Sequence, residues 1–376
     1  MDESKKASNK TPTVLVIDDS DIDRQVMLDL LMRAGFQVQD LPTAIGATRA
    51  AREFGARVVV IDQNLPALNG AKLAALFRSN PALKDIRVVL ISSNDETTMA
   101  QLVADHLGIP MDDVEIVHGD TGRVPFGMGT YGSRSASVGG TAIVMSLNKI
   151  KEKGKKIAAH LLEANPKDMD FVGGQFVVKG APQKAIPFGT VALTAYVPHN
   201  YPEGVEPGLE ETSFYDPANF CFPFGAHACV VEVDPDTGHV KILRYLAVDD
   251  VGNVINPMIV DGMVHGGIAQ GVAQALWEEA VYDADSGQLV SGSMMDYTLP
   301  KADMLPFYET DRTETPTPVN PLGVKGAGET GTIASTPAVV NAVVDALSAL
   351  GVDHIDAMPL TPERVWKTAQ AAKSRK

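Results

Sequence analysis

The chain has 376 residues, too many for one typical hydrophobic core, so two or more domains are expected. Its 45% hydrophobic and 21% charged residues are typical of a globular protein, and no apolar run approaches the roughly 20 residues of a membrane-spanning helix. Residues 1–95 carry 12 basic and 12 acidic side chains, so the net charge of −15 falls entirely within residues 96–376. Neither part has the basic face of a nucleic-acid-binding protein.

Residues 1–10 are polar and lack the apolar core of a signal peptide, so we expect them to be disordered and the protein to be cytoplasmic. The next part, residues 11–95, alternates short apolar runs with helical patterns. Strands are predicted at 14–17, 36–38, 58–61 and 88–91, and helices at 21–34, 43–54 and 70–78. This alternation predicts an α/β fold with a doubly wound parallel sheet.

Polar residues follow three of the predicted strands. Asp18 and Asp19 come after the first strand, Asp62 after the third and Ser92 after the fourth. In parallel sheets these positions share one edge, where ligands bind. Carboxylates that converge there repel one another unless a cation lies between them, and oxygen ligands suit Mg²⁺. The alternative is that these acids are simply solvated.

This part resembles the receiver domain of two-component response regulators, in Asp18-Asp19, in the run Ile61-Asp-Gln-Asn-Leu-Pro-Ala-Leu-Asn-Gly70, and in Ser92. The resemblance implies a flavodoxin-like fold, with Asp62 as phospho-acceptor, Asp18, Asp19 and Asp62 around Mg²⁺, Ser92 as switch hydroxyl and a histidine kinase as partner. No lysine matches the one that ends the family's fifth strand, and the likeness stops just after Ser93-Asn94, so we expect a truncated receiver. A predicted helix at 97–107 and strand at 114–117 have the order needed to complete its sheet.

The remaining elements are mixed. After the helix and strand just named, a glycine-rich turn at 127–135 leads into a helix at 136–164. Further helices are predicted at 187–196, 257–279, 337–350 and 361–372, and two strands, 228–233 and 239–248, are joined by the turn Asp234-Pro-Asp-Thr-Gly238. Residues 204–221, with their prolines and acids, are expected to form a long loop.

Two glycine-rich segments are candidates for binding. Hydroxyls and backbone amides of residues 127–135, at the start of a helix, suit a phosphate or pyrophosphate, although a flexible connector would have the same composition. Residues 323–332 contain four glycines, which allow close backbone approach, around Glu329. A poorly solvated Glu329 would have a raised pKa, suited to a general base. The alternative is a surface turn with a solvated Glu329.

Other polar residues are more ambiguous. Gln270 lies in a helix among small residues, where burial is expected, and either a ligand or a core hydrogen bond would satisfy its amide. His265 fits a structural role better than a ligand role. Cys221 and Cys229 are too few for a zinc site or a disulfide framework and are interpreted as ordinary buried thiols.

Residues 129–135, 249–274 and 321–332 together resemble the molybdopterin-binding large subunit of the xanthine dehydrogenase and aldehyde oxidase family, closest to the aerobic carbon monoxide dehydrogenase type. The resemblance covers residues 96–376 and implies an α+β molybdopterin-binding domain fragment. It implies cofactor contacts from eight residues: Gly129, Thr130, Tyr131, Gly132, Ser133, Arg134, Ser135 and Gln270.

The same resemblance implies that Glu329 is the general base of an oxidoreductase that hydroxylates an aldehyde, an N-heterocycle or CO. The cofactor would be molybdopterin, with the cytosine dinucleotide form as one option, and the partners an FAD subunit and a [2Fe–2S] subunit. The family's large subunit is much longer, so the N-terminal half of the site is expected to be absent and the chain inactive alone. Two alternatives stay open: a phosphorelay receiver that uses Asp62, and a chimera without a selected function.

Overall fold

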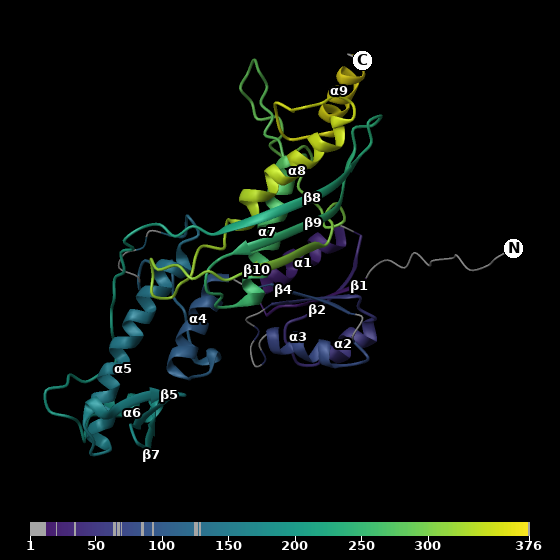
Figure 1. The fold of residues 1–376 in the computed structure, drawn as a ribbon. Coiled ribbons are helices and arrows are strands. Elements are labelled where there is room, and N and C mark those ends of the chain that lie inside the picture. Colours follow the sequence, from purple (N-terminus) through teal and green to yellow (C-terminus); the bar gives the residue numbers. More distant parts are fainter. Residues whose placement is uncertain are drawn as a thin grey trace. The chain divides into compact units, whose positions relative to one another are not determined.

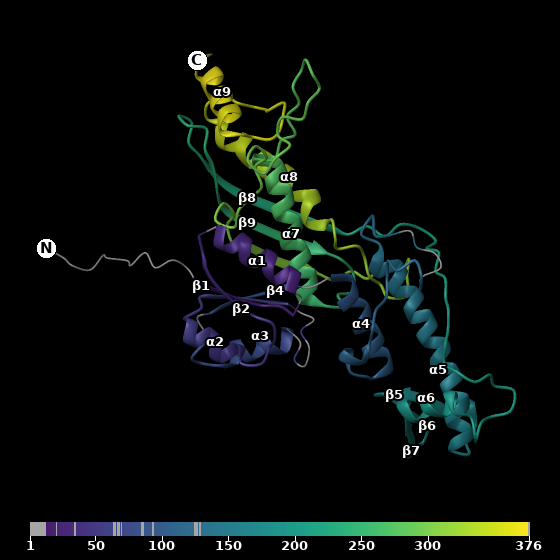
Figure 2. The ribbon, with the colours of Figure 1, turned by 180° about the vertical axis from the view of Figure 1, so that it is seen from behind.

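The structure is a computed structural model that describes residues 13–19, 21–33, 35–62, 65, 68, 70–83, 86–91, 94–123, 127 and 129–374 (Figures 1 and 2). The predicted disorder of residues 1–10 lies outside these ranges. The chain divides into two compact units, Met1–Thr97 and Thr98–Lys376.

Unit 1 contains a four-stranded parallel sheet in the order β2-β1-β3-β4. Its strands are β1 (Thr13–Ile17), β2 (Gln37–Leu41), β3 (Val58–Asp62) and β4 (Arg87–Ile91), and its helices are α1 (Asp21–Arg33), α2 (Ala47–Phe54) and α3 (Gly70–Ser79). The prediction of a parallel sheet with alternating helices is therefore confirmed.

The apolar runs of β1 and β3 reflect burial on both faces of this sheet. Leu15 and Ile61 lie in one core with Phe77 of α3, whereas Val16 lies in a second core with Leu31 of α1. Strands covered on both sides need apolar residues at every position, which is why these runs are continuous rather than alternating.

The expected completion of this sheet is wrong. Helix α4 (Asn94–Leu107) forms, and the division between the units falls within it. A short 3₁₀ turn, η1 (Met111–Asp113), follows, but residues 114–117 have no strand partner and are irregular. An apolar run becomes a strand only where another strand's free amides and carbonyls accept it. Among the described residues the sheet keeps four strands.

One lobe of unit 2 is built on a long helix. The π-helix η2 (Ser135–Gly140) leads into α5 (Thr141–Leu161), where a single uninterrupted helix was predicted. After η3 (Pro166–Asp168), an antiparallel sheet of β5 (Met169–Val172), β6 (Gln175–Val178) and β7 (Ala181–Pro187) and the helix α6 (Phe188–Tyr196) complete the lobe. Gly154 of α5 leaves room for the fully buried ring of Phe176.

The lobe is also rich in lysine. Residues 149–184 carry eight lysines and four acidic residues.

The larger part of unit 2 packs helices on a second sheet, in the order β10-β9-β8. Strands β8 (Phe224–Val233) and β9 (Val240–Asp250) pair antiparallel, and β10 (Tyr308–Thr313) pairs parallel with β9. Its helices are α7 (Pro257–Leu276), α8 (Thr330–Ser348) and α9 (Pro362–Lys373). They share one core with the sheet, around Tyr245, Ile268 and Val339. No helix in the described ranges has the length and apolarity to cross a membrane.

Helices α7 and α8 pack closely because their contact faces carry small residues. A Cβ on Gly267 would lie 2.9 Å from the amide nitrogen of Thr332, and one on Gly271 would meet the hydroxyl of Ser335. Helix α8 begins seven residues earlier than predicted. Pro337, which was predicted to lie in the first turn of this helix, lies in its interior.

Candidate functional site

The loop that precedes η2 is built on residues with left-handed backbone. Gly129 and Gly132 have φ of 72° and 59°, which glycine adopts without strain. Ser133 has a φ of 54°, a conformation that a residue with a Cβ adopts only when its surroundings hold it there. A Cβ on either glycine would have no atom within 4 Å, so this side of the loop is open.

Donor groups gather on this loop. The hydroxyls of Thr130 and Ser135 lie 3.1 Å apart and are hydrogen-bonded to each other. The guanidinium carbon of Arg134 lies 3.9 Å above the ring centre of Tyr131. The start of η2 adds backbone amides and the buried Ser137, whose hydroxyl donates to the carbonyl of Arg134 over 3.1 Å.

The loop meets the glycine-rich segment around Glu329. The Ser133 hydroxyl donates to Glu329 Oε2 over 2.6 Å. A Cβ on Gly326 would lie 2.6 Å from the Cβ of Ser133, and one on Gly328 would lie 3.2 Å from its Oγ. The prediction that these glycines allow close approach is confirmed, and the neighbour that approaches is the other candidate segment.

Lys325, the nearest cation to Glu329 in the sequence, binds elsewhere. Its Nζ donates to Asp250 Oδ1 over 2.8 Å, and the two side chains are 7% and 0% exposed. Its backbone amide donates to the carbonyl of Val251 over 2.7 Å, and its Nζ lies 4.4 Å from the ring centre of Phe224. This buried pair therefore fixes the glycine-rich segment to the end of β9.

Asp250 is held ionised by its neighbours. Burial alone would raise its pKa, but hydrogen bonds from Lys325, Thr315, the amide of Gly252 and Thr313 outweigh it and hold the pKa well below its usual range. The nearby His227 and Asp249 form a second buried contact, with His227 Nε2 3.2 Å from Asp249 Oδ2 and its Nδ1 2.9 Å from the hydroxyl of Tyr245.

Two expectations of burial are wrong. Glu329 precedes the first turn of α8 with its side chain exposed, so the assumption of a poorly solvated acid fails. Gln270 is exposed as well, because α7 buries Gly267, Ile268 and Gly271 and turns the Gln270 position outward. Its Oε1 lies 3.2 Å from Thr332 Oγ1, on the first turn of α8, so Gln270 and Glu329 are linked through that turn.

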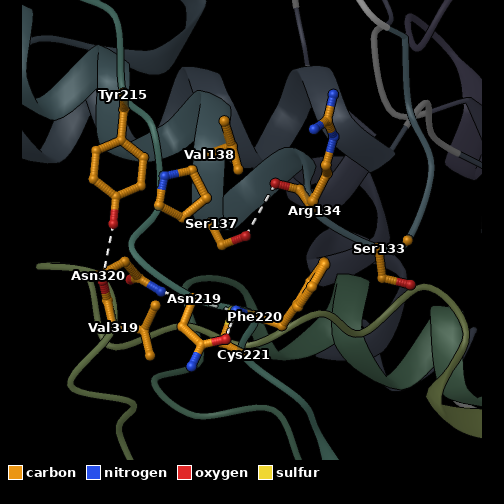
Figure 3. A pocket seen from close by; sticks show the side chains of 12 residues that line it. Ser133, Arg134, Ser137, Val138, Tyr215, Asn219, Phe220, Cys221, Val319 and Asn320 are labelled. Atoms are coloured by element: carbon orange, nitrogen blue, oxygen red, sulfur yellow. Dashed lines mark hydrogen bonds between the residues drawn. The ribbon is translucent and has the colours of Figure 1, made fainter.

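A cavity of about 100 Å³ lies beside the loop (Figure 3). Ser133, Arg134 and Ser137 line it on the η2 side, and the facing segments contribute Tyr215, Asn219, Phe220, Cys221 and Asn320. It is smaller than the roughly 300–1,000 Å³ of typical ligand pockets, so it would accept one part of a ligand. Asn219 and Phe220 were not predicted as site residues, because they lie in a segment that the sequence indicates only as a loop.

The remaining polar residues agree better with their expected roles. His265 Nε2 lies 3.1 Å from the hydroxyl of Thr310, and burial lowers its pKa. Both cysteines are unpaired and half-buried. Burial raises the pKa of Cys229 to about 11, as expected for an inert thiol.

In unit 1 the strand-end acids are neighbours by register. Ile17 of β1 pairs with Ile61 of β3, so Asp18 and Asp62, which follow them, lie at the same edge. Asp18 is buried, Asp62 half-buried and Asp19 exposed. Within the described ranges, no group of three or more His, Cys, Asp or Glu side chains is placed to hold a metal ion. Ser92 lies outside the described residues.

The chain matches the models of two known protein families. The family model for the molybdopterin cofactor-binding domain matches residues 92–306, more than half of the chain. The chain belongs to this molybdopterin-binding family. A second model, the response regulator receiver domain, matches residues 14–109. Both resemblances expected from the sequence are thus confirmed, and both models include helix α4.

The relatives of this chain are much longer than the chain itself. It is 46% identical to the carbon monoxide dehydrogenase large chain of Hydrogenophaga pseudoflava over 273 residues, which are 73% of this chain and 34% of that one. Reconstituted CO dehydrogenase from Oligotropha carboxidovorans matches with a TM-score of 0.71 and 43% identity, over 75% and 34% of the two chains. Quinoline 2-oxidoreductase from Pseudomonas putida 86 matches with a TM-score of 0.69 and 42% identity, over 75% and 36%. The chain spans about a third of these relatives.

The donor set of the loop fits a phosphate-bearing cofactor such as molybdopterin. Hydroxyls, a guanidinium group and backbone amides at a helix start are the groups that proteins use to bind phosphate. The space beside Gly129 and Gly132 is open to a ligand, and the cavity next to Ser133 is lined by further polar groups.

Proposed function

We propose that unit 2 holds a molybdopterin cofactor and presents Glu329 to a substrate, as part of an oxidoreductase of the molybdenum hydroxylase type. The observation that carries this proposal is the hydrogen bond between Ser133 and Glu329, which brings the donor-rich loop and the carboxylate together across 196 positions of sequence. Bound molybdopterin would supply the redox chemistry.

The chain's own residues would divide the work. Thr130, Ser133, Arg134 and Ser135 donate hydrogen bonds to the phosphate-bearing part of the cofactor, while Gly129, Tyr131 and Gly132 shape the loop around it. Gln270 contacts the cofactor from α7. Glu329 accepts a proton as general base during hydroxylation of an aldehyde, an N-heterocycle or CO.

Further polypeptide is needed to complete this site. A general base works best where water is excluded, and Glu329 and Gln270 are exposed in this chain. Phe220 and Phe222, which follow the cavity-lining Asn219, are 79% and 74% exposed. We therefore propose that the chain alone does not turn over substrate. The relatives include proteins named as large chains, so we propose that further chains join this one. We propose an FAD subunit and a [2Fe–2S] subunit as these partners, and the cytosine dinucleotide form as the variant of the cofactor.

Cofactor retention tests the proposal. The chain would be produced in a host that makes molybdopterin, and bound pterin would be measured as its fluorescent oxidation product, with molybdenum measured by mass spectrometry. We expect pterin in the wild type and at least about tenfold less in a Ser133→Ala, Ser135→Ala variant that lacks two donors. Ser348→Ala, at the exposed end of α8, is the matched control. Equal pterin in all three proteins would contradict the proposed loop.

A turnover assay with an artificial electron acceptor tests the predicted inactivity. We expect no turnover of CO, aldehydes or N-heterocycles by the isolated chain. Molybdenum near one per chain, with turnover that is abolished in Glu329→Gln, would show that the chain suffices and that no further polypeptide is required.

A second candidate function belongs to residues 11–95, the proposed receiver part. The register of β1 and β3 brings Asp18 and Asp62 to the same ligand-binding edge of the sheet, and this supports phosphoryl transfer to Asp62. Asp18, Asp19 and Asp62 are the proposed ligands of Mg²⁺, and since they are not grouped as a metal site among the described residues, the ion would have to draw them together. Acetyl phosphate with Mg²⁺ should add the mass of one phosphoryl group to the wild type and not to Asp62→Asn. No difference in the mass gained by the wild type and by Asp62→Asn would contradict this function and the histidine kinase proposed as its partner.

A further inference from the structure

Ser133 has a single hydroxyl proton, and the structure shows where that proton goes. The distance of 2.6 Å to Glu329 Oε2 lies within the roughly 2.5–2.7 Å of a hydroxyl that donates to an ionised carboxylate. Such charge-assisted bonds are stronger than those between neutral groups. The half-buried Ser133 reaches Glu329 because it adopts a left-handed backbone and because Gly326 and Gly328 have no Cβ to obstruct it.

The same hydroxyl belongs to the loop's donor set. Thr130 and Ser135 are already bonded to each other, which commits one of their two protons. Ser133 lies between them in the loop, so an oxyanion that fills the loop would reach its hydroxyl as well as the N–H groups of Arg134, which stacking on Tyr131 leaves available. A hydroxyl offers one donor, so the oxyanion and Glu329 compete for it.

We infer that Ser133 is a positioning residue that couples the loop to Glu329: its proton holds the Glu329 carboxylate while the loop is empty and passes to the oxyanion when the loop is filled. Glu329 is then released from its hydrogen bond only in the filled state. Filling of the loop would thus release the exposed Glu329 carboxylate from Ser133 and leave it able to turn towards a substrate. This inference rests on the proposed function of the loop and adds its regulation.

A double-mutant cycle with pyrophosphate as the probe separates this coupling from simple repulsion between two anions. Dissociation constants would be measured by calorimetry or ³¹P NMR on the full chain and on Glu329→Ala, Ser133→Ala and the double variant. Glu329→Ala frees the Ser133 proton and should tighten pyrophosphate binding. We expect this gain to be at least about tenfold larger when Ser133 is present than in the Ser133→Ala background.

Two additions guard against misfolding and against a merely structural effect. Ser133→Gly removes the hydroxyl while relaxing the left-handed backbone, and it should abolish the coupling as Ser133→Ala does. In protein labelled with ¹³C at glutamate carboxyls, the Glu329 signal, assigned by its absence in Glu329→Gln, should move when pyrophosphate is added to the wild type. It should stay in place in Ser133→Gly.

The outcomes distinguish the two proposals. A gain from Glu329→Ala that is the same with and without the Ser133 hydroxyl would overturn the coupling and leave the loop as an anion site. Failure of pyrophosphate to bind any variant would overturn the anion-binding role of the loop, and the coupling with it.

Discussion

At the scale of single residues, the ion pair of Lys325 and Asp250 fixes the position of the glycine-rich segment that carries Glu329. Their side chains are almost fully buried, and the backbone of Lys325 is bonded to the strand end that carries Asp250. Removing one partner of a buried ion pair leaves the other charge without compensation, and this costs far more than a surface ion pair contributes.

Replacement of Lys325 by Met should therefore destabilise unit 2 by about 3–5 kcal/mol, because Asp250 stays buried without its cation. The exposed Lys184→Met is the control and should change stability by less than about 0.5 kcal/mol. Denaturant unfolding followed by tryptophan fluorescence measures both. A loss of under about 1 kcal/mol in Lys325→Met would show that the pair is not what secures the segment.

The lowered pKa of Asp250 also predicts a pH dependence. In the unfolded chain this carboxyl would titrate near pH 3.9. Below that pH the unfolded state binds a proton, whereas the carboxyl of the native state stays ionised. The stabilisation is complete above about pH 4 and is lost as pH falls towards the native pKa. Asp250→Asn should flatten the fall of melting temperature between about pH 4 and pH 2. An unchanged slope in that variant would contradict the assignment.

At the scale of elements, helix α7 offers neighbouring glycines with opposite surroundings. A Cβ on Gly266 would meet nothing within 4 Å, whereas one on Gly267 would press on the backbone of Gly331 and Thr332. Alanine stabilises a helix interior relative to glycine, but only where its methyl group has space. The same substitution should therefore have opposite effects at adjacent positions.

We expect Gly266→Ala to raise the stability of unit 2 by up to about 1 kcal/mol and Gly267→Ala to lower it by about 1–3 kcal/mol, because α8 must move away. Since Glu329 immediately precedes α8, Gly267→Ala should also alter the ¹³C signal of its carboxyl. Thermal unfolding and that spectrum test the pair. Equal stability changes would mean that the two helices are less closely packed than the structure shows.

Elements were predictable from the sequence where periodicity and capping residues agreed. Helix α7 begins at Pro257 after the cap Asn256, whose side chain accepts a hydrogen bond from the amide of Ile259. Strands β5 and β6 were missed, although Gly173-Gly174 between two short apolar runs is a hairpin signal. Strand β10 has the polar sequence YETDRT and forms because β9 offers a free edge, which a sequence alone does not reveal.

The start of α8 shows a different limit. Proline favours the first turn of a helix, so Pro337 favoured a start there. The helix instead starts at Thr330, because α7 packs against residues 331–335 and compensates for the hydrogen bond that Pro337 cannot make. Likewise, the proximity of Ser133 and Glu329 follows from tertiary packing and not from any pattern within either segment.

At the scale of the whole molecule, each unit has its own core. Leu15, Ile17 and Phe77 are fully buried in unit 1, and Tyr245 and Ile268 in unit 2. Separate cores predict separate unfolding transitions. The chain also carries its own probe, since its two tryptophans, Trp277 and Trp366, both lie in unit 2.

Leu15→Ala, which opens a cavity in unit 1, should lower the stability of that unit by about 2–5 kcal/mol. Far-ultraviolet circular dichroism should then show an earlier first transition, while the tryptophan transition of unit 2 keeps its midpoint. A shift of the tryptophan midpoint by the same amount would show that the chain unfolds as one cooperative body.

The lobe of α5 and β5–β7 carries a net positive charge, whereas the chain as a whole is acidic. Its eight lysines and four acidic residues over positions 149–184 leave a surplus of positive charge in a chain whose total is −15. At low ionic strength this end should adhere to a cation exchanger even though the sequence pI is about 4.9. Salt above about 0.1 M, where the screening length falls to roughly 10 Å, should release it, and the chain would then behave as the acidic protein that its total charge describes.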